Sequence, residues 1–210
     1  SSAGYLEGFY YKPRVDDEII KKYSEGLIAT TSCLAGRVPQ ALMNEDMDEA
    51  NRQMQKYIDI FGKENYLVEL MDHGLPEQIA INPKLLELAE HHGLTVIATN
   101  DCHYVDRSDA EAHDALLCVQ TGTNIEDEKR FRFPNDQFYF LSPDEMREKF
   151  THCPEAVSNT EKIADMCDLD IPMGESLIPA YVPDGGYVDG ATPLSYLREL
   201  CHKGLEERYG

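Results

Sequence analysis

The sequence has no long apolar run, and this absence limits the class of protein. No stretch approaches the roughly 20 apolar residues that a membrane-spanning helix needs. The chain starts at Ser1 without the basic and apolar segments of a secretory signal peptide, and without an initiator methionine. A processed chain or an internal fragment is expected from such a start. The sequence predicts a cytoplasmic protein with no membrane partner, and its 42% hydrophobic content is enough for a packed core.

Basic residues and paired cysteines are also scarce. The 19 Lys and Arg residues are outnumbered by 39 Asp and Glu, so the formal net charge is −20. This charge disfavours direct binding of duplex DNA by this segment alone, because phosphates are repelled. No CxxC pair occurs among the six cysteines, so without a secretion signal we expect reduced thiols. They are Cys33, Cys102, Cys118, Cys153, Cys167 and Cys201.

Familiar catalytic signatures are missing as well. The sequence has no glycine-rich phosphate loop, no GxGxxG dinucleotide motif, no nucleophile elbow and no serine-triad pattern. These absences argue against enzymes that rely on those motifs for nucleotide binding or for acyl transfer. We assign no catalytic residue in this segment.

Three short apolar stretches alternate with helical patterns between residues 27 and 103. The stretches 27–33, 66–71 and 94–99 are typical of strands buried in a parallel sheet. Residues 45–61 have the spacing of an amphipathic helix, and a second helix is expected to begin at Asn82 and Pro83. This β-α-β-α-β order predicts an α/β fold with parallel strands, in a sheet or in part of a barrel.

The rest of the chain is expected to be mainly helical. Capping boxes at Ser108–Glu111 and Ser142–Glu145 predict two helix starts, Pro154 predicts a third, and residues 138–141 have the pattern of a strand. Residues 169–192 are rich in proline and glycine, which indicates a linker before a last helix. We therefore expect one domain over residues 1–170, and a linker with the start of a second domain over residues 171–210.

Polar side chains follow each expected strand at the point where it ends. Cys33 follows the first, Asp72 and His73 the second, and Asp101 and His103 the third. Because the carboxyl ends of parallel strands meet at one edge of a sheet, these groups are candidates for a divalent-metal site. Residues 101 and 103 are two apart, so in extended backbone their side chains point the same way. A polar loop after a strand is the alternative.

The other candidates are weaker on chemistry alone. A buried Cys33 is more often inert packing than a ligand, and His73 beside Gly74 has the character of a solvated turn residue. Glu69 lies within a strand, where it either faces the metal edge or forms a polar pair. His113 is expected to be structural or to support Asp101 or Tyr104. The good ligands number three or four, enough for one metal but not for a centre of two or three.

Several runs of residues resemble one protein family. The chain is similar to the PHP (polymerase and histidinol phosphatase) domain of bacterial DNA polymerase III α subunits, in the right order along nearly its whole length. The runs that carry the resemblance are 10–16, 32–36, 65–74, Ala98-Thr99-Asn100-Asp101-Cys102-His103-Tyr104, 112–122 and 154–160.

The resemblance implies a distorted β/α barrel with a metal cluster at the carboxyl ends of its strands. Asp101 and His103 match the Asp-x-His of the last family motif, and Cys33 matches the middle ligand. His73 matches a recurrent position without a known ligand role. The opening His-x-His of the family, and the His and Glu ligands after it, have no counterpart here, so a partial barrel followed by the start of the palm is expected. The resemblance implies Zn²⁺ or Mn²⁺ at this site, and Mg²⁺ for the parent polymerase.

The resemblance also implies the function and the partners. The chain is expected to be a piece of a DNA-synthesising enzyme, inactive by itself, whose intact PHP domain is structural or a 3′–5′ exonuclease. DNA, a proofreading exonuclease, the sliding clamp and the clamp loader are the expected partners of the whole protein. Open strand edges also predict self-association of this segment. The alternatives are a free-standing PHP-type phosphoesterase and a non-catalytic interaction module.

Overall fold

The computed structural model describes residues 1–174, 178, 180–188 and 190–210. The chain divides into two compact units, Ser1–Cys167 and Asp168–Gly210. The first unit holds the sheet and most of the helices, and the second holds one described helix, α9 (Pro193–Tyr209). The expected identities of the two parts, a PHP region and the start of a palm, stay predictions.

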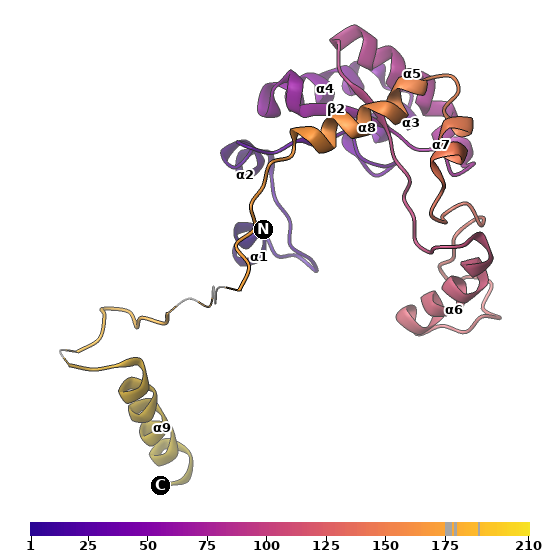
Figure 1. The fold of residues 1–210 in the computed structure, drawn as a ribbon. Helices are drawn as coiled ribbons and strands as arrows, with labels where there is room; N and C mark the ends of the chain where they lie inside the picture. Colours follow the sequence, from indigo (N-terminus) through magenta and orange to yellow (C-terminus); the bar gives the residue numbers. More distant parts are fainter. Residues whose placement is uncertain (175–177, 179, 189) are drawn as a thin grey trace. The chain divides into compact units, whose positions relative to one another are not determined.

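The first unit is built around a parallel sheet of three short strands. Figure 1 shows its central strand, β2, among the surrounding helices. They are β1 (Ala29–Thr30), β2 (Tyr66–Leu70) and β3 (Val96–Ala98), in the order β1-β2-β3. Two helices, α3 (Arg37–Met43) and α4 (Met47–Phe61), and a 3-10 turn, η1 (Lys63–Asn65), join β1 to β2. The single helix α5 (Pro76–His92) joins β2 to β3. The predicted α/β class and parallel order are confirmed, and the arrangement is consistent with part of a PHP-type barrel.

The core forms where the helices cover the central strand. Leu67, Val68 and Leu70 of β2 are almost fully buried, as a strand with neighbours on both sides and helices over its faces requires. Apolar side chains of α3, α4 and α5 pack around this strand, and those buried deepest are Val38, Leu42, Ala50, Met54, Leu85 and Leu88. α8 (Pro154–Met166) packs against β3, where the side-chain amide of Asn159 donates to the carbonyl of Val96 at 2.8 Å.

The remaining elements of the first unit are short. They are α1 (Ser2–Leu6), α2 (Asp17–Lys22), the 3-10 turn η2 (Arg107–Asp109), α6 (Ala110–Thr121) and α7 (Pro143–Lys149). α6 ends at Gly122, which has the positive φ of 66° that glycine adopts without strain. None of the described helices is long and apolar enough to cross a membrane.

Local sequence signals predicted several helix ends correctly. The capping box of Ser142 and Glu145 begins α7, Pro154 occupies the first turn of α8, and Thr192 caps α9. Gly93 ends α5 in the left-handed conformation. Ser142 and Thr192 accept hydrogen bonds from backbone N–H groups that the helix start leaves free, Pro154 has no N–H to leave unpaired, and Gly93 adopts the left-handed conformation that ends a helix.

The start predicted for α5 was wrong. The helix begins at Pro76, whose missing N–H costs nothing in the first turn, and Pro83 lies inside the helix. Asn82 is buried, and its side-chain amide donates to the carbonyl of Met71 at 3.1 Å. This asparagine thus anchors the middle of the helix to the end of β2 rather than capping it.

Three other local predictions were wrong. The capping box before α6 is formed by Asp106 and Asp109, not by Ser108 and Glu111. Residues 138–141 form no described strand, because they pair with the segment 103–105 through only a few backbone hydrogen bonds. β1 is half-buried and two residues long, since it lies at the edge of the sheet.

Candidate functional site

The three parallel strands end at one edge of the sheet, and the predicted ligands follow them there. Asp101 and His103 are brought together: Nε2 of the imidazole lies 3.2 Å from Oδ1 of the carboxylate. Their side chains are 50% and 37% exposed, so a solute can reach both groups. The backbone N–H of His103 donates to the carbonyl of Phe138 at 2.7 Å, which fixes the position of the residue.

The imidazole of His103 is packed by rings. Its centroid lies 4.6 Å from that of Phe133, 5.6 Å from that of His113 and 6.0 Å from that of Phe138. His113 also lies 5.2 Å from the ring of Tyr104. Three rings around one imidazole restrict its rotation, so its Nε2 atom stays directed toward Asp101.

His73 is buried, contrary to the solvated turn expected from the sequence. Its ring stacks on Phe138 at 4.5 Å, and the amide of Gln78 donates to Nδ1 at 3.1 Å. This donation places the proton of the neutral imidazole on Nε2, which has no hydrogen-bond partner among the described residues. Burial lowers the pKa of His73 below its usual value. The imidazole is therefore held neutral.

Glu69 takes the second of its two predicted roles, a polar pair. The hydroxyl of Thr30 in β1 donates to Oε2 at 2.5 Å, and the hydroxyl of Thr99 after β3 donates to Oε1 at 2.6 Å. Both carboxylate oxygens are engaged by hydroxyls of neighbouring segments. The side chain of Glu69 therefore links all three strand segments at the edge of the sheet.

Cys33 is exposed, not buried as expected for an inert packing residue. With Glu69, Gln78 and Asn82 it lines a small cavity of about 10 Å³ at the end of β1. Among the described residues, no three His, Cys, Asp or Glu side chains come together to hold a metal ion. Since a zinc site usually takes three or four protein ligands, Asp101 and His103 supply half of a site. The described residues therefore do not fit a complete metal centre.

A loop over residues 123–138 forms one wall of the site, and sequence reasoning missed its role. Arg130 makes two hydrogen bonds to Asp114 of α6, at 2.5 and 2.6 Å, and Arg107 makes two to Asp136, at 2.8 and 3.0 Å. The arginine hydrogen bonds lower the pKa of the Asp114 carboxyl, and lower that of Asp136 to about 2. These two ion pairs hold the loop that carries Phe133 against α6 and against the 3-10 turn η2.

The alternation of basic and aromatic residues over 129–133 is the sequence feature from which the role of this loop could have been predicted. The loop is also tied to the sheet edge, because the amide of Asn135 donates to the carbonyl of His73 at 2.8 Å. Beside the wall lies an open cavity of about 800 Å³. Its lining includes Tyr104, His113, Phe133 and Arg132.

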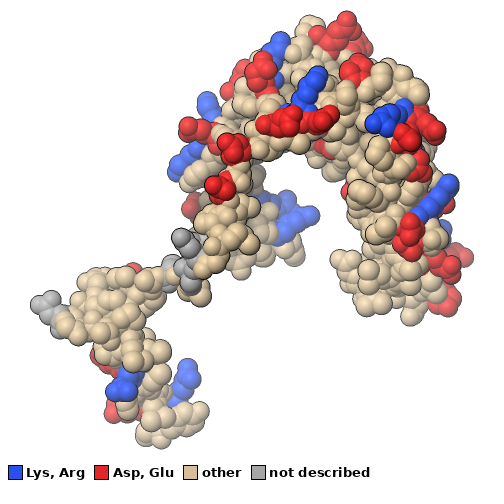
Figure 2. Space-filling view, viewed as in Figure 1, with Lys and Arg blue, Asp and Glu red and all other residues tan. Residues whose placement is uncertain are grey.

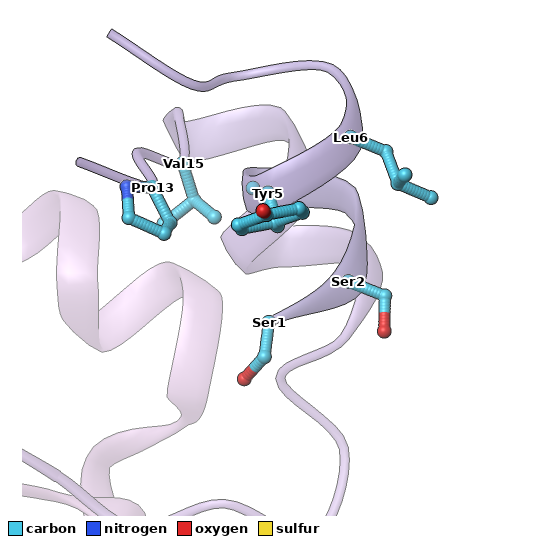
Figure 3. Close-up of a pocket in the computed structure, with 7 residues that line it drawn as sticks. Ser1, Ser2, Tyr5, Leu6, Pro13 and Val15 are labelled. Atoms are coloured by element: carbon cyan, nitrogen blue, oxygen red, sulfur yellow. The ribbon is translucent and has the colours of Figure 1, made fainter. Parts of the chain in front are cut away.

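A second hollow of similar size lies apart from the strand ends. It holds about 790 Å³ and is formed by α1 and the segment that follows it (Figure 3). The ring of Tyr5 faces Pro13 and Val15, whereas Leu6 points away. The hollow contains no imidazole, thiol or carboxylate, so its size does not make it a candidate for metal chemistry.

Comparison with known proteins gives one consistent result. Residues 1–73 match the PHP domain family. Over all of this chain, DNA polymerase III subunit alpha of Treponema pallidum is 43% identical, that of Thermus aquaticus 42% and that of Saccharopolyspora erythraea 48%. The chain spans 17 or 18% of the length of these relatives.

The matched PHP stretch includes Cys33, Glu69 and His73, whereas Asp101 and His103 lie beyond it. The similarity to the polymerase subunits continues through both of those residues. Residues 1–73 are therefore similar to the PHP domain, and the whole chain is similar to one segment of the DNA polymerase III α subunits.

Proposed function

We propose that this chain is the PHP-containing segment of a replicative DNA polymerase III α subunit and serves DNA replication as part of that protein. The observation that carries the proposal is identity of 42 to 48% over the whole chain with three such subunits. The packed α/β unit, with the loop over residues 123–138 held by two ion pairs, supports a structural role beside the polymerase domain. In this proposal residues 1–170 belong to the PHP region, and residues 171–210 hold a linker and the start of the palm.

The metal site is the finer part of the proposal. Asp101 and His103 provide an oxygen and a nitrogen donor that face each other at 3.2 Å, within reach of solvent. Cys33 is proposed as the third ligand, with His73 and Glu69 as weaker candidates, and the metal as Zn²⁺ or Mn²⁺. The engaged oxygens of Glu69 and the protonated Nε2 of His73 weigh against these two.

If further ligands of the parent protein completed the site, a metal there would supply activated water for phosphodiester hydrolysis, which is the chemistry of a 3′–5′ exonuclease. The residues of this chain bind and orient: Asp101 and His103 provide two ligands, and Phe133 and Phe138 restrict the imidazole. Because the described residues hold only half of a site, the segment alone is proposed to be inactive. The Mg²⁺-dependent polymerase chemistry belongs to the parent protein.

The proposed partners follow from the same assignment. DNA, a proofreading exonuclease, the sliding clamp and the clamp loader are partners of the parent protein in the cytoplasm. The net charge of −20 supports contact with DNA through other parts of that protein rather than through this segment.

Elemental analysis and calorimetric titration with Zn²⁺ and Mn²⁺ test the metal site. We expect the chain to bind one ion weakly, because Asp101 and His103 are only half of a site, and we expect the double variant Asp101→Ala/His103→Ala to lose it. The matched control is His152→Ala, an exposed histidine of the segment between α7 and α8. Absence of metal from the unaltered chain would refute the site, as would unchanged binding by the double variant.

A chimera tests the role in replication separately. The corresponding segment of the Thermus aquaticus subunit is replaced by this chain, and DNA synthesis is measured on a primed template. Synthesis close to that of the parent is expected, because the chain is 42% identical to that subunit over its whole length. Loss of synthesis by a soluble, folded chimera would count against the proposal, whatever the metal measurements give.

A further inference from the structure

The open cavity beside the loop over residues 123–138 is lined by aromatic rings and by an arginine. Tyr104, His113 and Phe133 contribute the rings, and Arg132 contributes the positive charge. We call this space the aromatic cavity. Its volume of about 800 Å³ lies within the roughly 300–1,000 Å³ that small-molecule sites span, so it has room for a ligand of the size of a mononucleotide.

The three rings of the aromatic cavity are held by contacts with one another and with the backbone. The ring of His113 lies 4.9 Å from that of Phe133 and 5.2 Å from that of Tyr104. The hydroxyl of Tyr104 accepts a hydrogen bond from the backbone N–H of Phe138 at 3.4 Å. All three side chains are half-buried, so part of each remains accessible to a ligand. Rings of this kind stabilise nucleobases by stacking, whatever the base.

Arg132 differs from the two other arginines near the cavity in its partners. Arg107 and Arg130 are paired with Asp136 and Asp114, whereas Arg132 is exposed and forms no ion pair with a described residue. Asp114 also lines the cavity, but both of its carboxylate oxygens accept hydrogen bonds from Arg130. The guanidinium of Arg132 is therefore available to an anion, and phosphate is an anion that arginine binds well.

The acidity of the chain determines how much nucleic acid this site can accept. The net charge is −20, and acidic side chains are spread over the visible face of the first unit with basic ones among them (Figure 2). Such a surface repels a duplex, which presents many phosphates at once, so duplex contacts stay with other parts of the parent protein. Glu111 also lines the cavity and weakens the attraction between Arg132 and a phosphate. Binding here therefore requires stacking of a base in addition to the phosphate contact.

The aromatic cavity adjoins the pair formed by Asp101 and His103. The ring of His103 lies 4.6 Å from that of Phe133 and 5.6 Å from that of His113, and both of these rings line the cavity. Since Asp101 and His103 are exposed, a strand can reach them from solvent. A strand end at this pair places a neighbouring nucleotide beside the rings.

We propose that the aromatic cavity binds one nucleotide of a single DNA strand, with its base against the three rings and a phosphate at Arg132. The inference rests on the proposed function, because it makes the cavity the place where a strand end is held beside Asp101 and His103. It assigns a binding role to Arg132, and to Phe133 a second role besides packing His103. The cavity binds and orients the nucleotide, and no bond forms or breaks there.

Nucleotide titrations of the metal-free chain test this site. Deoxyadenosine monophosphate, deoxyadenosine and deoxyribose phosphate are added separately in the presence of EDTA, and NMR spectra of the isotope-labelled chain are recorded. We expect saturable shifts of the signals of residues 104, 113, 132 and 133. The nucleotide is expected to bind at least about fivefold more tightly than either of its parts, because only the nucleotide combines stacking with the phosphate contact.

Two variants separate the stacking from the phosphate contact. Arg132→Gln is expected to weaken binding of the monophosphate and of deoxyribose phosphate, but not that of deoxyadenosine. Phe133→Leu keeps an apolar side chain without the ring, and is expected to weaken binding of the monophosphate and of deoxyadenosine at least about fivefold, but not that of deoxyribose phosphate. Lys129→Gln and Phe131→Leu remove the same charge and the same ring at exposed loop positions outside the cavity lining, and are the matched controls. Far-UV circular dichroism verifies that all four variants are folded.

Three results would overturn the proposal. The first is a titration with the monophosphate that gives no saturable shift, or shifts only away from the aromatic cavity. The second is binding of deoxyribose phosphate as tight as that of the monophosphate, which would leave the base without a role. The third is equal binding by each variant and its control. Because no metal is present and no DNA synthesis is measured, failure here leaves the metal titration and the chimera unaffected, and failure of either leaves this measurement unaffected.

Discussion

At the scale of single residues, hydrogen-bond partners decide which polar groups are free for chemistry. Glu69 lies within β2 and His73 follows it, and the ligand atoms of both are poorly suited to a metal, because the oxygens of Glu69 are hydrogen-bonded and Nε2 of His73 carries the proton. The carboxylate of Glu69 accepts two hydroxyl hydrogen bonds, and Gln78 fixes the proton of His73 on Nε2. Asp101 and His103 differ because both are exposed and face each other.

Glu69→Ala is expected to destabilise the fold by about 1–3 kcal/mol, because it leaves the hydroxyls of Thr30 and Thr99 without their acceptor in a partly buried site. Urea unfolding measures the change. Glu87→Ala, which removes an exposed carboxylate from α5, is the control and should change stability little. Equal losses in the two variants would mean that the link between the strands contributes nothing.

At the scale of elements, helix ends show how local chemistry produces structure. The capping box at the start of α7 uses Glu145, whose carboxylate accepts from the hydroxyl of Tyr139 at 2.6 Å and from the backbone N–H of Ser142 at 2.8 Å. These hydrogen bonds, with that of the Tyr139 hydroxyl the largest cause, lower the pKa of Glu145 from 4.5 to about 2. The cap therefore also ties α7 to the segment that passes beside His103.

The lowered pKa of Glu145 predicts an acid-sensitive contribution to stability. A carboxyl group whose pKa is lower in the folded state stabilises the fold fully above its unfolded value, and this contribution is lost as pH falls from 4.5 toward 2. Glu145→Gln should thus be less stable than the unaltered chain at pH 7, with a difference that shrinks below pH 4.5. Urea midpoints at several pH values measure it, and Glu148→Gln on the same helix is the control. A difference that does not change with pH would contradict this assignment.

Replacement of glycine by alanine is expected to have opposite effects on stability at positions 122 and 204. Gly122 ends α6 at φ 66° with no atom within 4 Å of an added Cβ, so Gly122→Ala is expected to cost about 1 kcal/mol through backbone strain alone. Gly204 lies inside α9, also in open space, where alanine favours the helix by about 0.5–1 kcal/mol.

Thermal unfolding of the first unit and the helical content of α9 measure these two effects. Gly122→Asn serves as a milder comparison, because asparagine tolerates the left-handed region better than alanine. A stabilising Gly122→Ala would show that the left-handed end of α6 is not maintained in solution.

At the scale of the whole molecule, the two units differ in how they are stabilised. The first, Ser1–Cys167, has a continuous buried core around β2, whereas α9 of the second has no buried residue. The second unit is stabilised by a local cluster of tyrosines, in which the ring of Tyr196 lies about 6 Å from those of Tyr181 and Tyr187. A helix without a core to cover its apolar side is only marginally stable.

Limited proteolysis should therefore separate the units. Most described residues between 168 and 192 are exposed, so we expect early cleavage there and a resistant fragment close to residues 1–167. Mass spectrometry identifies the cut sites, and urea unfolding shows whether the fragment keeps a cooperative transition. Early cleavage inside α4 or α5 would contradict the division into units.

The sequence by itself determined the order of the three parallel strands, the helices α4 and α5 between them and several helix ends, because these depend on periodicity, glycine and caps within a few residues. It also determined the similarity to the PHP domain, through motifs that are continuous in the chain. Only the tertiary structure decided that His73 is buried, that Glu69 links three segments and that a fastened loop packs His103. The hydrogen bonds of Glu69 with Thr30 and Thr99, and of Asn135 with His73, join residues 30 to 62 positions apart and depend on how the segments pack. Such contacts cannot be predicted from the local sequence pattern, because each residue type can pair with many others and only the packing of the folded chain selects the partner.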